Sequence, residues 1–265
     1  MKKDIKSKED KKLEMKRHSL AHIMALAIKR MYKNVSFGIG PSNEIGFYYD
    51  VLTKKTINDD SLLDIEKEIK KIISEKLPFV KKEIKISEAI KLFKELNQEF
   101  KIELLNDLKD YGTTDQNEIL LIKDKKQKRG EKVSMVTLYI LGKVKKDISL
   151  KELIKNQDIF IDLCRGPHIK NTEEINLESF KIFKLAGAYF RGSEKNKMLT
   201  RVYGLAFNDK FEVDEYLKLM EEAEKRDHRK LGKELDLFSV DDYVGAGLVL
   251  WHPKLSLVRE EIEMY

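Results

Sequence analysis

The sequence predicts an α+β fold in which helices and strands are intermixed. Several segments have apolar residues at three- and four-residue steps, which is typical of amphipathic helices. Others have β-branched and aromatic runs bounded by glycine or proline, which is typical of strands. The two kinds of segment do not alternate regularly, so a doubly wound parallel sheet is disfavoured. With 265 residues, 42% of them hydrophobic, the chain can bury a core as one large or two modest domains.

Three helices are predicted early in the chain from apolar positions at helical spacing: residues 12–32, 60–76 and 87–97. Ser87 is the expected N-cap of the third helix. Residues 1–12 mix acids with lysines and are expected to form a disordered start. From Val35 to Val51, glycines and a proline punctuate short apolar runs, which predicts two strands and a turn.

The rest of the chain is predicted to be richer in strands. Residues 101–105 are expected to form a strand that leads into a loop, and residues 111–156 a hairpin with a charged tip. The runs DIFIDLCRGPH, FKIFKLAGAYFRG and MLTRVYGLAF predict further strands joined by glycine-containing turns. A strongly charged helix is predicted from Asp214 to Lys233.

Composition narrows the classes of function only slightly. The 52 Lys and Arg residues exceed the 46 Asp and Glu residues by a formal charge of +6, which permits a nucleic-acid partner without demonstrating one. The single cysteine, Cys164, excludes an intramolecular disulfide and fits a reducing compartment, so a cytoplasmic location is expected. The first residues lead into no long apolar stretch, so they are expected to form neither a signal peptide nor a membrane-spanning helix. No membrane partner is expected.

Two short motifs carry residues that can perform chemistry. In HSLAH, His18 and His22 are spaced so that a helix places both rings on one face. In CRGPH, Cys164 and His168 flank a Gly-Pro turn at the end of a predicted strand. Either pair alone is weak support for a site. Because the chain has only five histidines and three of them occur in these motifs, both pairs are expected to form one pocket.

These residues leave three mechanisms open. Histidines and a thiolate can bind zinc with an open position for water. A histidine can also hold or deprotonate a water without a metal, and a Cys-His pair can act as a nucleophile. HSLAH lacks the glutamate that metalloproteases place after the first histidine, so protease chemistry is disfavoured.

Longer strings carry a family resemblance. In order along the chain, HSLAH, IGPSNEIGFYYD, FKIELL, DLCRGPH, KLAGAYFRG, NKMLTRVYG and KRDHRKLGKELDLF resemble threonyl-tRNA synthetases. The resemblance implies an editing domain of the type shared by threonyl- and alanyl-tRNA synthetases at residues 13–212. It implies a linker helix at residues 213–233, and at residues 234–265 the truncated start of a class II aminoacylation domain, its motif 1.

The same resemblance implies an activity and its catalytic residues. The editing domain is expected to hydrolyse mischarged Ser-tRNA(Thr), an aminoacyl-tRNA ester. His18 and Lys101 are expected to hold or activate the attacking water. Asp162 and Cys164 are expected to engage the seryl amine or polarise that water.

Four further residues are expected to bind the substrate. His22 and His168 match family positions that shape the editing pocket. Tyr189 and Arg191 belong to an aromatic and basic stretch from Lys184 to Tyr203 that also includes Phe190, Lys197 and Arg201. Such a mixture suits stacking on an unpaired tRNA end and contacting its phosphates.

Cofactors and partners follow from the resemblance as well. Editing is expected to need no cofactor, while zinc at His18, His22, Cys164 and His168 stays an alternative. ATP, magnesium and zinc belong to the parent enzyme's aminoacylation core, whose motifs 2 and 3 the sequence lacks, so no aminoacylation is expected. The expected partner is the acceptor end of tRNA(Thr). A homodimer is expected for the full-length enzyme, and a monomer is compatible with this chain.

Two other functions remain as alternatives. A stand-alone trans-editing deacylase would use the same chemistry but would leave the motif 1 segment unexplained. A zinc-stabilised RNA-binding module would use the four His and Cys residues only to fold the domain. Sensitivity of folding to a chelator distinguishes the zinc-stabilised module from a metal-free hydrolase.

Overall fold

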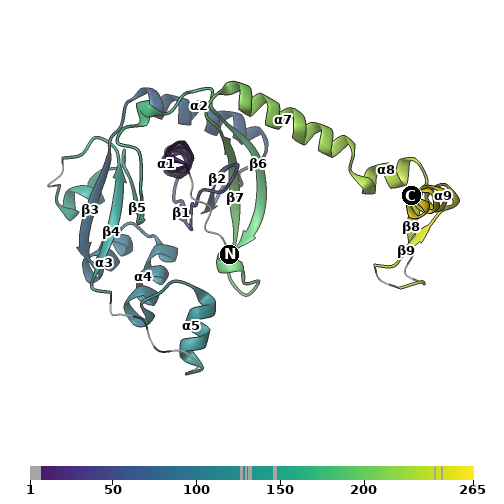
Figure 1. Ribbon diagram of the computed structural model, residues 1–265. Coiled ribbons are helices and arrows are strands. Elements are labelled where there is room, and N and C mark those ends of the chain that lie inside the picture. Colours follow the sequence, from purple (N-terminus) through teal and green to yellow (C-terminus); the bar gives the residue numbers. More distant parts are fainter. Residues whose placement is uncertain are drawn as a thin grey trace. The chain divides into compact units, whose positions relative to one another are not determined.

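The computed structural model describes residues 7–125, 128, 130, 133–145, 148–241, 243–245 and 247–265. The chain divides into two compact units (Figure 1): unit 1 extends to Lys210, and unit 2 runs from Phe211 to Tyr265. This division lies close to the boundary predicted after residue 212.

Unit 1 contains a four-stranded antiparallel sheet in the order β1-β2-β7-β6. Its strands are β1 (Ser36–Phe37), β2 (Gly46–Leu52), β6 (Phe180–Tyr189) and β7 (Met198–Ala206). They confirm the two strands predicted between Val35 and Val51 and the two predicted in the later glycine-containing runs. On β2, Phe47, Tyr49 and Val51 are fully buried, because alternate residues of a strand face the same side.

A second antiparallel sheet of unit 1 has the order β3-β4-β5. Its strands are β3 (Phe79–Lys85), β4 (Met135–Leu141) and β5 (Phe160–Leu163). β5 confirms the strand predicted in DIFIDL. The hairpin predicted at residues 111–156 is wrong, because β4 is the central strand and both strands that pair with it, β3 and β5, lie outside that segment. Part of its charged tip lies outside the described residues.

The helices of unit 1 confirm the α+β class and the three helices predicted early in the chain. They are α1 (Lys8–Met31), α2 (Asp60–Ser74), α3 (Ile86–Glu95), α4 (Glu99–Tyr111), α5 (Gln116–Lys123) and α6 (Leu150–Lys155), with 3-10 turns η1 (Thr172–Glu174) and η2 (Phe190–Gly192). α1 lies between the two sheets and contacts strands of both (Figure 1). It is therefore buried on all sides along much of its length.

α1 begins earlier than predicted. Ser7 is its N-cap: the Ser7 hydroxyl accepts a hydrogen bond from the Asp10 amide (3.0 Å), and the Asp10 carboxylate accepts one from the Ser7 amide (3.0 Å). The expected disordered start is therefore wrong for residues 8–12, while residues 1–6 lie outside the described part. α3 begins at Ile86, so Ser87 lies in its first turn and is not the N-cap.

Residues 101–105 belong to a helix and not to the strand that was predicted. In α4, Phe100, Leu105 and Leu108 are buried at helical spacing. The helix ends at Gly112, whose φ of 77° is a left-handed conformation that suits glycine. The same helix carries Lys101 into the interior, where its side chain is only 2% exposed.

Unit 2 contains three helices and a hairpin among its described residues: α7 (Lys210–Lys225), α8 (His228–Glu234), the strands β8 (Phe238–Val240) and β9 (Val249–Trp251), and α9 (Pro253–Met264). The single linker helix predicted at residues 213–233 is wrong. Asp227 interrupts it as the N-cap of α8, where its carboxylate accepts a hydrogen bond from the Arg229 amide (2.8 Å). In the described ranges of the chain, we find no helix with the length and apolar character needed to cross a membrane.

Candidate active site

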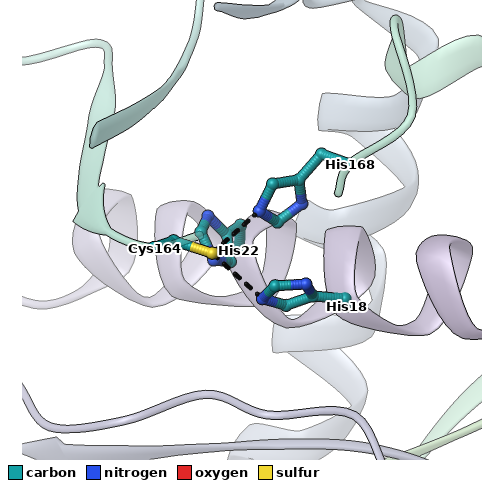
Figure 2. A group of neighbouring side chains, drawn as sticks. All are labelled: His18, His22, Cys164 and His168. Atoms are coloured by element: carbon teal, nitrogen blue, oxygen red, sulfur yellow. Dashed lines mark hydrogen bonds between the residues drawn. The ribbon is translucent and has the colours of Figure 1, made fainter. Parts of the chain in front are cut away.

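The structure brings the two predicted pairs together in unit 1. His18 and His22 lie on one face of α1, and Cys164 and His168 lie on the loop that follows β5 (Figure 2). One nitrogen or sulfur atom of each residue lies within 4.8 Å of those of the others. We call these four residues the His/Cys cluster.

A glycine shapes the loop that carries Cys164 and His168. Gly166 has a φ of +71°, and a Cβ atom there would lie 2.4 Å from the Tyr139 hydroxyl. Its amide donates a hydrogen bond to the Cys164 sulfur (3.2 Å). The glycine therefore permits both the turn and the close approach of this loop to β4. The CRGPH segment can thus fold back toward α1.

Cys164 contacts two rings of the cluster. Its Sγ lies 3.2 Å from Nε2 of His18 and 3.3 Å from Nε2 of His168 (Figure 2). Burial, with the nearby Asp162 carboxylate, raises the pKa of the Cys164 thiol to about 12. Because a nucleophilic cysteine needs a thiolate, the metal-free Cys-His nucleophile is the least favoured of the three mechanisms.

The three histidines of the cluster are neutral at physiological pH. Burial lowers the pKa of His18, and a backbone hydrogen bond to Pro167 and the Asp162 charge only partly oppose this. Burial also lowers the pKa of His22 and of His168, and mutual repulsion between the rings adds to the effect. A neutral imidazole has one nitrogen that can accept a proton or bind a metal, so the cluster is suited to either task.

Asp162 contacts His22 and links it to two further buried side chains. Its carboxylate lies 3.4 Å from His22 Nε2, accepts a hydrogen bond from the Tyr49 hydroxyl (2.5 Å) and pairs with the Lys101 ammonium. The Lys101 Nζ also lies 3.2 Å from the Tyr49 hydroxyl. All four side chains are buried, so this network is a support for His22 and not a surface that meets solvent.

Sequence reasoning missed Tyr49. The residue lies on the core-facing side of β2, between two buried apolar neighbours on that face, Phe47 and Val51. A buried tyrosine hydroxyl needs a hydrogen-bond partner. A tyrosine among the core-facing residues of a predicted strand could therefore have indicated a buried polar group nearby. Burial and the Asp162 charge raise its pKa well above the ordinary value, so it remains a neutral donor.

A cavity of about 480 Å³ opens beside the cluster. Its lining combines α1, the loop before β2 and the Gly-Pro turn: Lys11, Glu14, Met15, His18, Pro41, Ser42, Gly166 and Pro167. Pockets for small ligands have volumes of about 300–1,000 Å³. His18 is the member of the cluster that lines this cavity.

The two predicted tRNA-binding residues lie where β6 ends: Tyr189 is the last residue of β6, and Arg191 lies in η2 and pairs with α4. Tyr189 is 40% exposed. The Arg191 guanidinium pairs with Asp107 (2.5 Å) and Glu103 (3.1 Å), and its side chain is 10% exposed. The neighbouring members of this stretch are also engaged: Phe190 packs on Phe100, Lys197 pairs with Glu99, and Arg201 pairs with Asp50.

Comparisons with known proteins point to one family. Residues 152–203 match the second additional domain of threonyl and alanyl tRNA synthetases. The threonine-tRNA ligase of Anoxybacillus flavithermus is 44% identical to this chain over 253 residues, which are 96% of this chain and 33% of that enzyme. Over the same coverage, identity is 43% to the ligase of Geobacillus kaustophilus and 44% to threonine-tRNA ligase 1 of Bacillus subtilis. The chain thus spans about a third of the length of these relatives.

Proposed function

Because this chain is related to threonine-tRNA ligases along nearly its whole length, we propose that unit 1 is an editing domain that hydrolyses Ser-tRNA(Thr). The observation that carries the proposal is the convergence of His18, His22, Cys164 and His168 beside a cavity of ligand size. Three neutral rings and a protonated thiol form a pocket that can handle water and an ester without a permanent charge.

The energetics of amino-acid selection explain why such a pocket is needed. Serine differs from threonine by one methyl group, and one methyl contact gives only about 1–3 kcal/mol, or roughly 10–200-fold discrimination. A second pocket that excludes the threonine methyl but admits serine can remove the errors that remain. Hydrolysis in that pocket adds its own selectivity to that of aminoacylation.

His18 is the proposed general base. It lines the cavity, and its neutral ring can accept a proton from a water molecule as that water attacks the ester carbonyl carbon. The same proton can then pass to the ribose oxygen as the ester C–O bond breaks, leaving free serine and an uncharged tRNA end. The neutral Cys164 thiol, 3.2 Å from His18 Nε2, is placed to orient the water or the seryl amine.

The roles expected for Lys101 and Asp162 need revision. Both side chains are buried and pair with each other, so neither is placed to touch water in the cavity. We assign them a positioning role: they hold Tyr49 and the Nε2 side of His22. His22 and His168 shape the pocket around Cys164. Tyr189 and Arg191 remain proposed contacts for the tRNA end, and Tyr189 is the more accessible of the two.

Zinc binding is the second candidate, and a specific observation favours it. With Nε2 of His22 facing Asp162, its Nδ1 is buried and has no hydrogen-bond partner. A carboxylate behind a metal-binding histidine is a common arrangement. His18, His22, Cys164 and His168 would hold the ion, and their nitrogen and sulfur donors are those that zinc prefers. A bound zinc ion would stabilise the fold and, with an open position, would polarise water.

Other proposals rest on the family relationship alone. We propose that residues 234–265 begin a class II aminoacylation domain, and that the parent enzyme uses ATP, magnesium and zinc there. The acceptor end of tRNA(Thr) is the proposed partner, with a homodimeric, cytoplasmic parent enzyme. The relatives align over 96% of the chain, which extends into unit 2, and this supports a ligase segment over a stand-alone deacylase.

Release of serine from Ser-tRNA(Thr) by the full chain tests the proposal, with Thr-tRNA(Thr) as the comparison substrate. We expect serine-selective hydrolysis, and a fall in rate of roughly 10²–10⁴-fold in His18→Ala, because a general base typically contributes that much. His228→Ala is the matched control, since that side chain is exposed in unit 2. If the chain hydrolysed neither substrate, editing by this chain would be excluded.

A chelator separates the two candidates. Metal-free editing predicts that chelation changes neither the rate nor the unfolding midpoint. Zinc binding predicts that chelation lowers the unfolding midpoint and that added zinc restores it.

A further inference from the structure

Ser19 is a buried polar residue that the proposed mechanism does not use. It lies on α1 beside His18 and is 0% exposed. Its Oγ has three polar neighbours: the Met15 carbonyl at 2.8 Å, the Ile169 amide at 3.1 Å and Nδ1 of His168 at 3.1 Å. Ser19 therefore joins α1 to the loop that carries Cys164 and His168.

The donors and acceptors around Ser19 can be balanced. A serine hydroxyl has one proton to donate and two lone pairs. The Met15 carbonyl can only accept and the Ile169 amide can only donate, so the first takes the hydroxyl proton and the second takes one lone pair. The remaining lone pair faces Nδ1 of His168, and all three contacts become hydrogen bonds only if Nδ1 carries a proton.

The opposite tautomer forms fewer bonds. If Nδ1 of His168 had no proton, the Ser19 hydroxyl would have to turn its own proton toward the ring and abandon the Met15 carbonyl. One hydrogen bond of the set would be lost. The bond count therefore favours the tautomer of His168 that is protonated at Nδ1.

The tautomer decides what His168 offers to the pocket. With the proton on Nδ1, Nε2 has a free lone pair, and Nε2 lies 3.3 Å from the Cys164 sulfur (Figure 2). The ring is stacked on Phe79, with ring centroids 4.9 Å apart, and Tyr139 packs edge-on at 4.5 Å. These contacts hold the plane of the ring, and the contact with Ser19 bears on which ring nitrogen carries the proton.

We propose that Ser19 is a positioning residue that holds His168 in the Nδ1-protonated tautomer and so directs the Nε2 lone pair at Cys164. The effect on catalysis rests on the proposed editing function, but the tautomer itself does not. The same tautomer serves either candidate, because a lone pair at Nε2 can accept the thiol proton or bind zinc.

The tautomer can be measured directly. In protein labelled with ¹⁵N-histidine, long-range ¹H–¹⁵N spectra distinguish protonated from unprotonated ring nitrogens. For His168 in the full chain we expect a protonated Nδ1 and an unprotonated Nε2, with and without chelator. A protonated Nε2 in the unsubstituted protein would overturn the proposal, and this result does not depend on any variant folding.

Two substitutions test whether Ser19 is the cause. We expect Ser19→Ala to mix the tautomers of His168 and to lower kcat for Ser-tRNA(Thr) about tenfold with little change in KM, which is the effect of losing about 1.4 kcal/mol. Ser19→Thr retains a hydroxyl, so we expect it to keep the Nδ1-protonated tautomer of His168 and a kcat close to that of the unsubstituted protein.

Ser179→Ala is the matched control. Ser179 is 4% exposed in the same unit, and its hydroxyl donates to the Asn176 carbonyl (2.9 Å) away from the cluster. We expect this variant to lose a buried hydrogen bond without changing the His168 tautomer. If Ser19→Ala kept both tautomer and kcat, the proposal would fail. If the unsubstituted chain showed the Nδ1-protonated tautomer but no deacylation, only the editing function would fail.

Discussion

The two units differ in what they do with their histidines and apolar side chains. In unit 1, His18, His22 and His168 are drawn into one cluster, and burial makes all three neutral. In unit 2, the His228 side chain is 82% exposed, and His252 pairs with Asp236 near the surface (2.9 Å). The three histidines of the cluster therefore share one enclosed site, whereas His228 and His252 lie apart in unit 2 and belong to no such cluster among the described residues.

Apolar residues show the same contrast. Unit 1 buries two large apolar clusters around α1 and α3. Among the described residues of unit 2, Val213 is the one buried apolar side chain, while Leu257, Ile262 and Trp251 are 64%, 71% and 47% exposed. Stability that depends on burial must therefore come from unit 1, and substitutions in the two units should have unequal effects.

The largest effect is expected from Asp162→Ala. This change leaves the Lys101 ammonium buried without its partner, at a cost of about 3–5 kcal/mol in the free energy of unfolding. Urea denaturation measures it. The matched control is Glu222→Ala, which breaks an exposed pair with Arg226 (2.8 Å) in unit 2 and should cost at most about 1 kcal/mol. Equal costs would contradict the contrast between the units.

Ile69→Ala should have the next largest effect. Ile69 lies on α2, is 0% exposed, and belongs to the apolar cluster around α1. Removing most of its side chain should cost about 2–5 kcal/mol by urea denaturation, because a cavity remains. A cost under about 1 kcal/mol would mean that this part of unit 1 is not closely packed.

Acid sensitivity offers a smaller test at Glu66. Burial acts to raise the pKa of this carboxyl, but hydrogen bonds from Lys70, Lys181 and the Ile182 amide outweigh it and lower the pKa. A carboxyl with a lowered pKa in the folded state adds stability above its unfolded pKa of about 4.3, and the contribution is lost as the pH falls.

Glu66→Gln should therefore make the unfolding free energy fall less steeply between about pH 5 and pH 3. The slope is measured from urea denaturation at a series of pH values. Glu222→Gln, an exposed change in unit 2, should leave the slope as it is. An unchanged slope in Glu66→Gln would show that its contacts with lysine do not persist in solution.

The smallest effect is expected from Leu257→Ala on α9. Because this side chain is 64% exposed, the unfolding free energy should change by no more than about 0.5 kcal/mol. Thermal unfolding followed by circular dichroism provides the measurement. A cost as large as that of Ile69→Ala would show that unit 2 buries its apolar residues in solution.

Local patterns predicted much of unit 1. The helical spacing of HSLAH, the Gly-Pro turn of CRGPH and the short apolar run that forms β2 each depend on residues a few positions apart, and all were predicted from the sequence. Residues 101–105 were predicted wrongly, because a short apolar run fits either a strand or a helix. The packing of α4 against α3, together with the Gly112 cap, decided for the helix.

The sequence by itself determined the α+β class, the similarity to threonine-tRNA ligases and the two pairs of His and Cys residues, because each depends on residues close together along the chain. The tertiary structure alone decided three contacts. Lys101 is a buried partner of Asp162, the Tyr49 hydroxyl donates a hydrogen bond to Asp162, and the Ser19 hydroxyl faces His168. These contacts join residues 113 and 149 positions apart for Tyr49–Asp162 and Ser19–His168. Burial and hydrogen bonding depend on what packs nearby in space, and no local pattern records that.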